Sequence, residues 1–449
     1  MLYHYNNGVI DNPQIIWEKG EIIQPPLLKR LIGLYVIDMN YYKVGDSFLF
    51  SRPLFDDLEA SDECTVKNHE GTIYFLRRSD PLLSRRGFKA MSTSQLENET
   101  EDLELLEYEE DSTDFPEWIR NRIFAGDVKV VNNNYPSWKD ELDPLPEKWR
   151  INIAALGDVG STLAIGLRLL GKNISAIGLY DRSPDKQKRW EYELGQIRRP
   201  FDEDSMPKVA SVSVEDLFNC DMFVFCASKG IPPVGSSVSD VRMAQFEGNR
   251  EIIHKYAKMA RSIGFKGYFA VVSDPVDPLC KAVFIDSNSD DNGKMDFNGI
   301  APNKIIGFGL GVMNARAAFY AEKEGSLGQY LREGQVFGPH GSGLIVADSM
   351  VDYNNEKSIY LTEKTVKANL EIRALGYKPY VAPSLSSGSL SIIAAIQGDY
   401  FYGSSLMGHV YMGSKIRITD SGLEVPQYSL HPLLKERLKE TYNGLRSII

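Results

Sequence analysis

The sequence has few cysteines and few histidines, and their spacing excludes several kinds of site. Its 449 residues include four cysteines and six histidines. No two cysteines form a C-x-x-C pair, which argues against a zinc ribbon or a thioredoxin-type redox site. Cys220 and Cys226 fall on or beside an apolar run, where buried free thiols are common. We therefore expect reduced core cysteines in a cytoplasmic protein.

Long hydrophobic runs and a basic stripe are also missing. No stretch approaches the roughly 18 consecutive apolar residues of a membrane span, and the start, MLYHYNNGVIDNPQ, does not read as a secretion signal. The net charge is -11, and residues 97–117 hold eleven acidic residues and no basic one. We predict no membrane and no nucleic-acid partner. The acidic stretch is interpreted as a solvated helix face or loop, with a docking surface for a basic partner as the alternative.

Changes of pattern along the chain predict three domains, at residues 1–148, 149–310 and 311–449. The first mixes short β-like runs with the acidic stretch and carries no recognisable chemistry motif. It ends in NNNYPSWKDELDPLPEK, a proline-rich polar segment typical of a linker. We expect this N-terminal domain to be separable from the rest by limited proteolysis.

The second region alternates short apolar strands with helical stretches. INIAAL, AIGLYD, DMFVFCAS and YFAVVSD are strand-like, while GDVGSTLAIGLRLLGK and NREIIHKYAKMARSIG are helical. Such alternation predicts an α/β fold with a doubly wound parallel sheet. The third region combines helices such as LSIIAAIQGDYF with β-like segments such as GHVYMGSKIRITD. It outlines an α+β domain.

A glycine turn joins the first strand of this sheet to its helix. It reads Ala155-x-Gly157-x-x-Gly160, so alanine replaces the first glycine of the dinucleotide fingerprint. Gly157 allows the backbone to approach a pyrophosphate, and Gly160 allows the helix to pack on the strand. Asp181 ends the second strand, where a carboxylate accepts from ribose hydroxyls and favours NAD over NADP. The alternative is a tight turn with an empty site. The expected cofactor residues here are Gly157, Asp158, Val159, Gly160 and Asp181.

Taken in order, several segments from about residue 150 to the C-terminus resemble the lactate/malate dehydrogenase family. They are GDVGSTLA, DMFVFCASKGIPP, VRMAQFEGNREII, VVSDPVDPL, IGFGLGVMNAR and GPHGSG. The resemblance implies a Rossmann NAD-binding domain followed by an α+β catalytic domain. It also implies a 2-hydroxy or 2-keto acid substrate and a homo-oligomer, either a dimer or a tetramer. Residues 1–148 have no counterpart in the family.

The resemblance also assigns roles to individual residues. His340 takes the position of the acid/base, and Arg316 that of the arginine that binds the substrate carboxylate. Arg242 takes that of the loop arginine that polarises the substrate carbonyl. Gly388 and Ser389 are expected to form the substrate wall. Ala227, Ser228 and Asn249 are expected to contact the cofactor.

Two departures from the family fall in this expected site. The aspartate that orients the family's histidine stands three residues before the carboxylate-binding arginine, and Met313 occupies that position here. A gap could place Asn314 there, but Arg316 would then lose its register. The family has an asparagine directly after the VVS strand, and in this sequence Asp274 replaces it. We hypothesise that Asp274 orients His340 in place of the missing aspartate; the alternative is that Asp274 contacts a substrate group that is not a simple keto acid. The loop GIPPVGSSVSD carries no cation for a second substrate carboxylate.

Three functions remain open from the sequence. The first is an NAD-dependent 2-hydroxy acid dehydrogenase with an altered active site, which uses His340, Arg316, Arg242 and Asp274. The second is an NAD-binding protein with little or no dehydrogenase activity and a sensor or regulatory role. The third is an enzyme like the NAD- and metal-dependent glycosidases, although no metal-binding residues are evident. The segment DSNSDDNGKMDFNG resembles a calcium loop, but its twelfth position lacks the bidentate glutamate, so we expect a polar surface loop.

Overall fold

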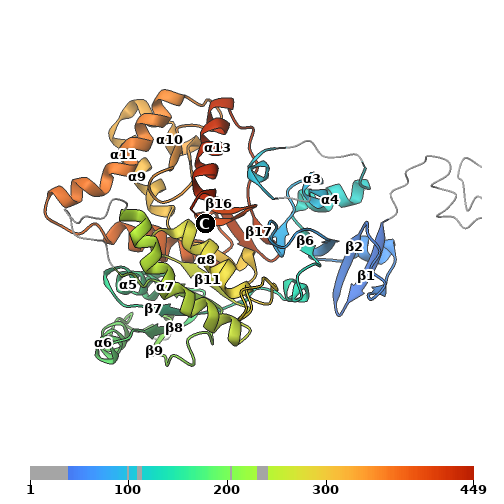
Figure 1. Ribbon diagram of the computed structural model, residues 1–449, viewed down its shortest axis with the longest axis horizontal. Coiled ribbons are helices and arrows are strands. Elements are labelled where there is room, and N and C mark those ends of the chain that lie inside the picture. The colour runs from blue at the N-terminus through green and yellow to red at the C-terminus, as the bar shows by residue number, and fades with distance from the viewer. Residues whose placement is uncertain (1–38, 99–100, 109–113, 203–204, 230–240, 449) are drawn as a thin grey trace, which may run out of the picture.

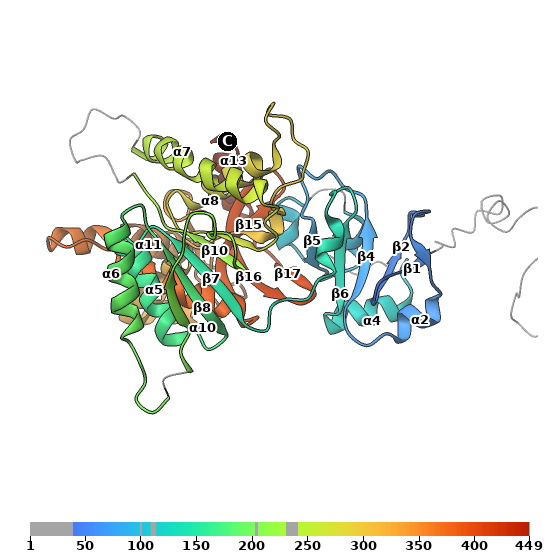
Figure 2. The same cartoon turned by 90° about the horizontal axis from the view of Figure 1, so that it is seen from below.

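The computed structural model describes residues 39–98, 101–108, 114–202, 205–229 and 241–448. The described chain contains a nine-stranded sheet, a six-stranded sheet and a two-stranded hairpin. In Figures 1 and 2 the smaller sheet, built from the N-terminal residues, lies beside one end of the larger one. None of the described helices is long and apolar enough to cross a membrane.

The larger sheet begins with six parallel strands in the order β9-β8-β7-β10-β11-β12. If the six strands are numbered 1 to 6 by their order along the chain, the order across the sheet is 3-2-1-4-5-6, that of a doubly wound dinucleotide-binding fold. The expected doubly wound sheet is therefore confirmed. The strands are β7 (Trp149–Ala154), β8 (Ile174–Tyr180), β9 (Lys208–Ser211), β10 (Met222–Phe225), β11 (Tyr268–Val271) and β12 (Ile305–Gly307).

Helices cover both faces of this parallel sheet because its strands are apolar on both faces. Along β10, Val224 packs with the cluster that includes helix α5, while Phe223 and Phe225 pack with the cluster that includes α7 and α8. Alternate side chains of one strand thus enter two separate cores. The helices are α5 (Asp158–Leu170), α6 (Pro184–Gly195), α7 (Val241–Ser262) and α8 (Val276–Asn288).

The same sheet continues into the C-terminal region through antiparallel strands. β15 pairs with β12 at Ser404 and Gly307, and β16 and β17 follow in order. The sheet therefore runs without a break across the expected boundary at residue 310. The elements of this region are α9 (Gly311–Lys323), α10 (Tyr330–Glu333), β13 (Gln335–Phe337), β14 (Ile345–Ala347), α11 (Asn355–Ala374), the π-helical η6 (Pro383–Ser389), α12 (Leu390–Ile396), β15 (Phe401–Met407), β16 (Val410–Thr419), β17 (Gly422–Glu424) and α13 (Pro432–Arg446).

The N-terminal region has its own sheet, in the order β3-β1-β2-β4-β6-β5, and its own hydrophobic cores. β2, β4 and β6 run parallel, and the crossover from β4 to β6 contains α4. The elements are β1 (Asn40–Val44), β2 (Ser47–Ser51), β3 (Glu59–Ala60), α2 (Glu63–Asn68), β4 (Ile73–Arg77), β5 (Gly87–Lys89), α3 (Ser94–Glu97), η1 (Leu103–Leu106), α4 (Glu117–Ala125), β6 (Val128–Asn132) and η2 (Trp138–Glu141).

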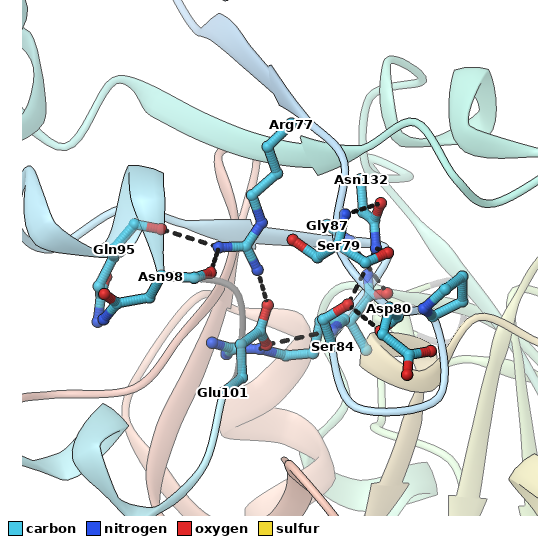
Figure 3. A network of polar contacts seen from close by, with 12 residues as sticks. Arg77, Ser79, Asp80, Ser84, Gly87, Gln95, Asn98, Glu101 and Asn132 are labelled. Atoms are coloured by element: carbon cyan, nitrogen blue, oxygen red, sulfur yellow. Dashed lines mark hydrogen bonds and ion pairs between the residues drawn. The ribbon is translucent and has the colours of Figure 1, made fainter. Parts of the chain in front are cut away.

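The acidic stretch is partly internal, so its interpretation as a solvated face is wrong for several of its residues. Glu101 is 1% exposed and pairs with the buried guanidinium groups of Arg77 and Arg85, as Figure 3 shows in part. Arg77 also donates to the carbonyl oxygens of Gln95 (3.1 Å) and Asn98 (2.7 Å). The carboxylate of Glu101 thus fixes the loop between β5 and η1 to the end of β4.

The same stretch ties the N-terminal region to the C-terminal one. Leu106, fully buried, joins the core of the larger sheet, and Glu107 pairs with Lys435 of α13 at 2.6 Å. At the sheet edges, Lys89 pairs with the buried Glu424 of β17 at 2.8 Å. Several residues of the acidic stretch thus have specific opposite-charge or apolar partners within the chain.

The expected polar linker at residues 133–148 is exposed at many positions, but three of its side chains are buried. Tyr135 is 1% exposed, Trp138 7% and Glu141 2%. Glu141 accepts from Arg86 Nε (2.9 Å) and from Asn303 Nδ2 (3.1 Å), so residues of both regions hydrogen-bond to it. Proline and polar residues misled the sequence interpretation, because the apolar and charged side chains between them find partners on two surfaces.

Candidate active site

The glycine turn follows β7 directly and has a backbone suited to a phosphate. Ala155 has a φ of +74°, the left-handed region that the fingerprint's first glycine occupies at lower cost. A Cβ at Gly160 would lie 2.1 Å from the carbonyl oxygen of Ala155, so only glycine allows this packing. A Cβ at Gly157 would meet nothing within 4 Å. The turn is therefore tight beneath and open in front of the N-terminus of α5, as a pyrophosphate requires.

Asp181 lies beside this turn at the end of β8. It accepts hydrogen bonds from the backbone N–H groups of Leu156 (2.9 Å) and Ser183 (3.0 Å), and Lys186 Nζ lies 3.3 Å away. Burial opposes ionisation, but these hydrogen bonds and the lysine outweigh it and lower the pKa of Asp181. An ionised carboxylate at this position suits ribose hydroxyls and disfavours a 2′-phosphate.

Asp158, in the first turn of α5, pairs with Lys378, which lies 220 positions further along the chain. The Nζ–Oδ2 distance is 3.0 Å, and both side chains are exposed. The structure thus brings a cation from beyond the end of α11 to the phosphate turn, which no local sequence signal could indicate. Val159 lies next to Asp158 in α5.

The ends of β10 and β11 are joined by the fully buried Asn249. Its Oδ1 accepts from the backbone N–H of Lys229 (2.8 Å), and its Nδ2 donates to the backbone oxygen of Asp274 (2.7 Å). Ser273 Oγ donates to the carbonyl oxygen of Ala227 at 2.6 Å. These bonds hold Ala227 and Ser228 at the carboxyl edge of the sheet, the edge where such folds bind ligands. Asn249 therefore organises this edge from within.

His340 stands in the connection between β13 and β14, where glycines shape the backbone. Gly338 and Gly343 have φ values of +86° and +87°, which other residues rarely adopt. A Cβ at Gly309 would lie 3.1 Å from Cβ of His340, so the lack of a side chain at Gly309 lets the histidine approach the end of β12. The turn thereby places the imidazole next to the strand ends that carry Asp274.

His340 and Asp274 are in direct contact. The Nδ1–Oδ1 distance is 2.9 Å, and the two side chains are 16% and 43% exposed. Met313 is only 2% exposed and belongs to an apolar cluster, while Asn314 accepts a hydrogen bond from the hydroxyl of Tyr330 at 2.7 Å. The carboxylate that contacts the imidazole is therefore that of Asp274, and Asn314 has another partner.

Arg316 lies one helical turn after Met313 on α9 and is half-buried. The hydrogen bond found for its guanidinium among the described residues is a weak one, 3.7 Å from Nη1 to Met313 Sδ. Burial lowers its pKa, while the charges of Tyr320 and Asp274 act in the opposite direction. Arg316 is thus a cation near Asp274 and His340 with donors left for a carboxylate.

A second carboxyl group, Asp277, lies beneath this pair and was not singled out from the sequence. It is 2% exposed and hydrogen-bonded to Ser404 Oγ of β15 at 2.6 Å. Burial raises its pKa to about 7; the hydrogen bond from Ser404 and the charge of His340 oppose this effect, while the negative charge of Asp274 adds to it. The sequence shows Asp277 within the VVSDPVDPL segment. Its burial could not be predicted, because it depends on packing against β15, more than a hundred residues away.

Gly388 and Ser389, the expected substrate wall, lie at the end of the π-helical η6. Both are buried in η6 against α5: a Cβ at Gly388 would lie 2.7 Å from the Leu163 side chain, and Ser389 Oγ would clash with a Cβ at Gly166. Their place at the substrate wall stays a prediction. Ser387 of the same turn donates to the carbonyl oxygen of Gly309 (2.6 Å) and accepts from the N–H of Val312.

Two expected features lie outside the described residues. The loop 230–240, GIPPVGSSVSD, is one, and the side chain of Arg242 at the start of α7 is the other.

The calcium-like segment, DSNSDDNGKMDFNG, lies within the described residues. There Asp296 binds Arg261 through both oxygens (2.8 and 2.6 Å), and Asp290 accepts from the N–H groups of Asn292 and Lys294. The described residues include no group of three or more histidine, cysteine or acidic side chains that could hold a metal.

Comparisons with known proteins agree on the fold. No family model matches the chain. It is 24% identical over 287 residues to an L-lactate dehydrogenase of Staphylococcus haemolyticus, covering 62% of this chain and 84% of that one. L-lactate dehydrogenase 2 of Staphylococcus aureus is 22% identical over 330 residues, covering 65% and 95%.

Solved structures give the same result. A lactate dehydrogenase from a Medee basin deep-sea metagenome library has a TM-score of 0.54 at 18% identity, covering 67% of this chain and 98% of its own. The malate dehydrogenase of Plasmodium falciparum has a TM-score of 0.53 at 15% identity, covering 67% and 96%. About two thirds of the chain thus has the fold of these enzymes, and the resemblance seen in the sequence is confirmed. The N-terminal part is not constrained by these likenesses.

Proposed function

We propose that this chain, two thirds of which has the fold of the lactate/malate dehydrogenase family, is an NAD-dependent oxidoreductase of 2-hydroxy or 2-keto acids. The observation that carries the proposal is the 2.9 Å contact between His340 and Asp274 beside Arg316. An acid/base, its orienting carboxylate and a cation for a substrate carboxylate are the groups that such a reaction needs from the protein. The glycine turn and Asp181 fit a dinucleotide, which would supply or accept the hydride when bound.

The residues of the site divide the remaining work. Asp274 accepts from Nδ1–H of His340, which leaves Nε2 as the atom that exchanges a proton with the substrate oxygen. Arg316 orients the substrate through its carboxylate, and Arg242 would approach the carbonyl from α7. The N–H groups at the start of α5 would hold the pyrophosphate, with Lys378 moving between Asp158 and the phosphates. Ala227, Ser228 and Asn249 would line the nicotinamide side.

A screen of 2-keto acids with NADH tests the proposal directly. The expected result is NADH oxidation with at least one substrate, which His340→Gln abolishes without weakening NADH binding. Lys367→Gln, on an exposed face of α11, is a matched control that should leave turnover unchanged. Turnover that survives His340→Gln would remove this histidine from the acid/base role.

A second candidate is an NAD-binding protein with little or no turnover. The observation that favours it is the buried Met313, which removes the orienting carboxylate from its usual helix. NADH binding, measured by fluorescence, without oxidation by any 2-keto acid would support this alternative. Saturable NADH binding together with turnover would exclude it.

We also propose that the protein forms a homo-oligomer. Large apolar side chains at the end of α11 and just beyond it, including Leu370, Leu375 and Tyr377, are exposed in the single chain. Light scattering after size-exclusion chromatography measures the state, and a monomer at micromolar concentration would contradict the proposal. The cytoplasmic location stays a prediction.

A further inference from the structure

A cavity of about 430 Å³ lies at the opposite end of the parallel sheet from His340. Trp149, Tyr268 and Lys304 line it at the amino ends of β7, β11 and β12, whereas the glycine turn and Asp274 stand at the carboxyl ends. Lys129 of β6 and residues 140–146 form another wall, and the turn at 419–423 between β16 and β17 a third. The cavity therefore exists only where the N-terminal region docks, and its volume is within the usual range of about 300–1,000 Å³ for small-molecule sites.

The lining as a whole has five carboxylates, Asp140, Glu141, Asp143, Asp221 and Asp420, and three lysines, Lys129, Lys266 and Lys304. Close to Lys304, however, the cations outnumber the carboxylates, because Arg86 lies just behind the wall. The single buried carboxylate, Glu141, already has two cations, Arg86 Nε at 2.9 Å and Lys129 Nζ at 3.0 Å. Lys304 is a third, and its Nζ donates to the backbone oxygen of Lys266 at 2.9 Å. Burial lowers the pKa of Lys304 to about 8; Glu141 and Asp140 oppose this effect, and the neighbouring Arg86 and Lys129 add to it. An anion that entered would relieve this incompletely balanced charge.

The floor beside Lys304 is aromatic. The ammonium of Lys304 lies 5.8 Å from the ring centroid of Tyr268, whose ring is 5.6 Å from that of Trp149. At the mouth, Asp143 and Asp420 are exposed carboxylates. An apolar or aromatic body fits the floor, one negative charge fits Lys304, and the mouth disfavours anions of higher charge.

We propose that this junction cavity binds a small organic monocarboxylate with an apolar or aromatic body. The carboxylate pairs with Lys304 and the body covers Tyr268 and Trp149. Because the walls come from both regions, the ligand would strengthen their association. The site is separate from the one at His340, and the inference does not rest on the proposed oxidoreductase activity.

Calorimetric titration of the full chain with phenylacetate tests the proposal. We expect saturable binding, at least about tenfold weaker for Lys304→Gln and unchanged for the matched control Lys208→Gln on the exposed β9. Phenylacetamide, which lacks the charge, and inorganic phosphate, which lacks the apolar body, should bind at least about tenfold more weakly than phenylacetate. Arg316→Gln should leave the main titration unchanged, because that residue belongs to the other site.

A variant at the exposed mouth gives a second test that does not disturb the buried charges. Asp420→Ser removes a like charge and should strengthen phenylacetate binding by about two- to fivefold. The proposal is overturned if phenylacetate does not bind the wild-type chain. It is equally overturned if binding is insensitive to Asp420→Ser, or survives Lys304→Gln and is lost in Arg316→Gln.

Discussion

Replacing Asp274 with asparagine removes the charge beside His340 while keeping the size of the side chain. Two unit charges about 4 Å apart interact by about 4 kcal/mol at an effective dielectric constant of about 20, and by about 1 kcal/mol in water. Because Asp274 is 43% exposed, its environment lies between these limits. About 2 kcal/mol of lost stabilisation of the protonated imidazole corresponds to a roughly 30-fold fall in kcat.

The assay has one readout that needs substrate and one that does not. The first is kcat from NADH absorbance, with Asp352→Asn as a control at an exposed carboxylate of the same region. The second is the ¹⁵N NMR spectrum of the imidazole, which reports the nitrogen that carries the proton. Asp274 can only accept and fixes Nδ1–H, whereas an asparagine can donate or accept and should permit both tautomers. An unchanged tautomer and kcat with a raised KM would show that Asp274 contacts substrate instead.

The double variant with Met313→Asp asks whether the carboxylate has changed sides. Met313→Asp alone places an acid in an apolar cluster, so we expect lower stability and no gain in turnover. Combined with Asp274→Asn, the new acid would face an imidazole without a charged partner. The double variant should then recover at least about a third of the fall in log kcat that Asp274→Asn alone causes. Such non-additivity is expected of groups that act as one unit. Strict additivity of the two changes would refute the compensation.

The remaining predictions concern stability and cofactor choice. Glu101→Gln leaves two buried guanidinium groups without their charge partner and should lower the free energy of unfolding by about 3–5 kcal/mol in urea denaturation, unlike Glu104→Gln at an exposed position. The pKa of Asp277 is raised from 3.8 to about 7 in the folded state, which therefore holds the proton more tightly than the unfolded chain. The contribution of this proton to the free energy of unfolding falls as pH rises from about 4 to 7. Asp277→Asn should therefore flatten the pH profile of stability and be the more stable protein at pH 8, by at most about 4 kcal/mol; an unchanged profile would contradict the burial of an ionisable group there. NADH should bind at least about tenfold more tightly than NADPH, and Asp181→Ser should reduce that ratio; equal affinities in the wild type would contradict the role of Asp181. Because Leu106 and Glu107 pack on the C-terminal region, we now expect, in contrast to the separable domain expected from the sequence, that deleting residues 1–148 gives an insoluble or unfolded fragment; a folded fragment with normal NADH binding would show that the junction contributes little.

Local patterns were sufficient for the parallel sheet and its turn. The apolar strands, the spacing of Gly157 and Gly160, and the acid at Asp181 follow from short-range rules of packing and backbone geometry. The contact between His340 and Asp274 was hypothesised from the sequence through the family resemblance. The 2.9 Å distance supports it, while the role of the contact in catalysis stays a prediction.

Contacts between distant segments could not be predicted. Glu101 belongs to a stretch that appeared solvated, and its burial depends on arginines 16 and 24 positions away. Lys89 and Glu424 lie in regions that no pattern connected. The π-helical turn that packs Gly388 against Leu163 was not predicted either, because the sequence carries no signal for an extra residue within a helix. In each case the deciding partner lies outside the window in which a periodicity or motif can be recognised.

The position of the N-terminal region follows from the two unlike edges of the parallel sheet. The carboxyl edge carries the glycine turn, Asp181 and His340, and it must stay open for ligands to enter. The amino edge, with Trp149 and Lys304, has no such constraint, so an added region can cover it without obstructing the site. Covering that edge brings polar groups from two surfaces together, and Glu141 accepts hydrogen bonds from both. Where the two surfaces do not meet fully they leave the cavity at Lys304, so the same docking that stabilises the chain also creates the second proposed site.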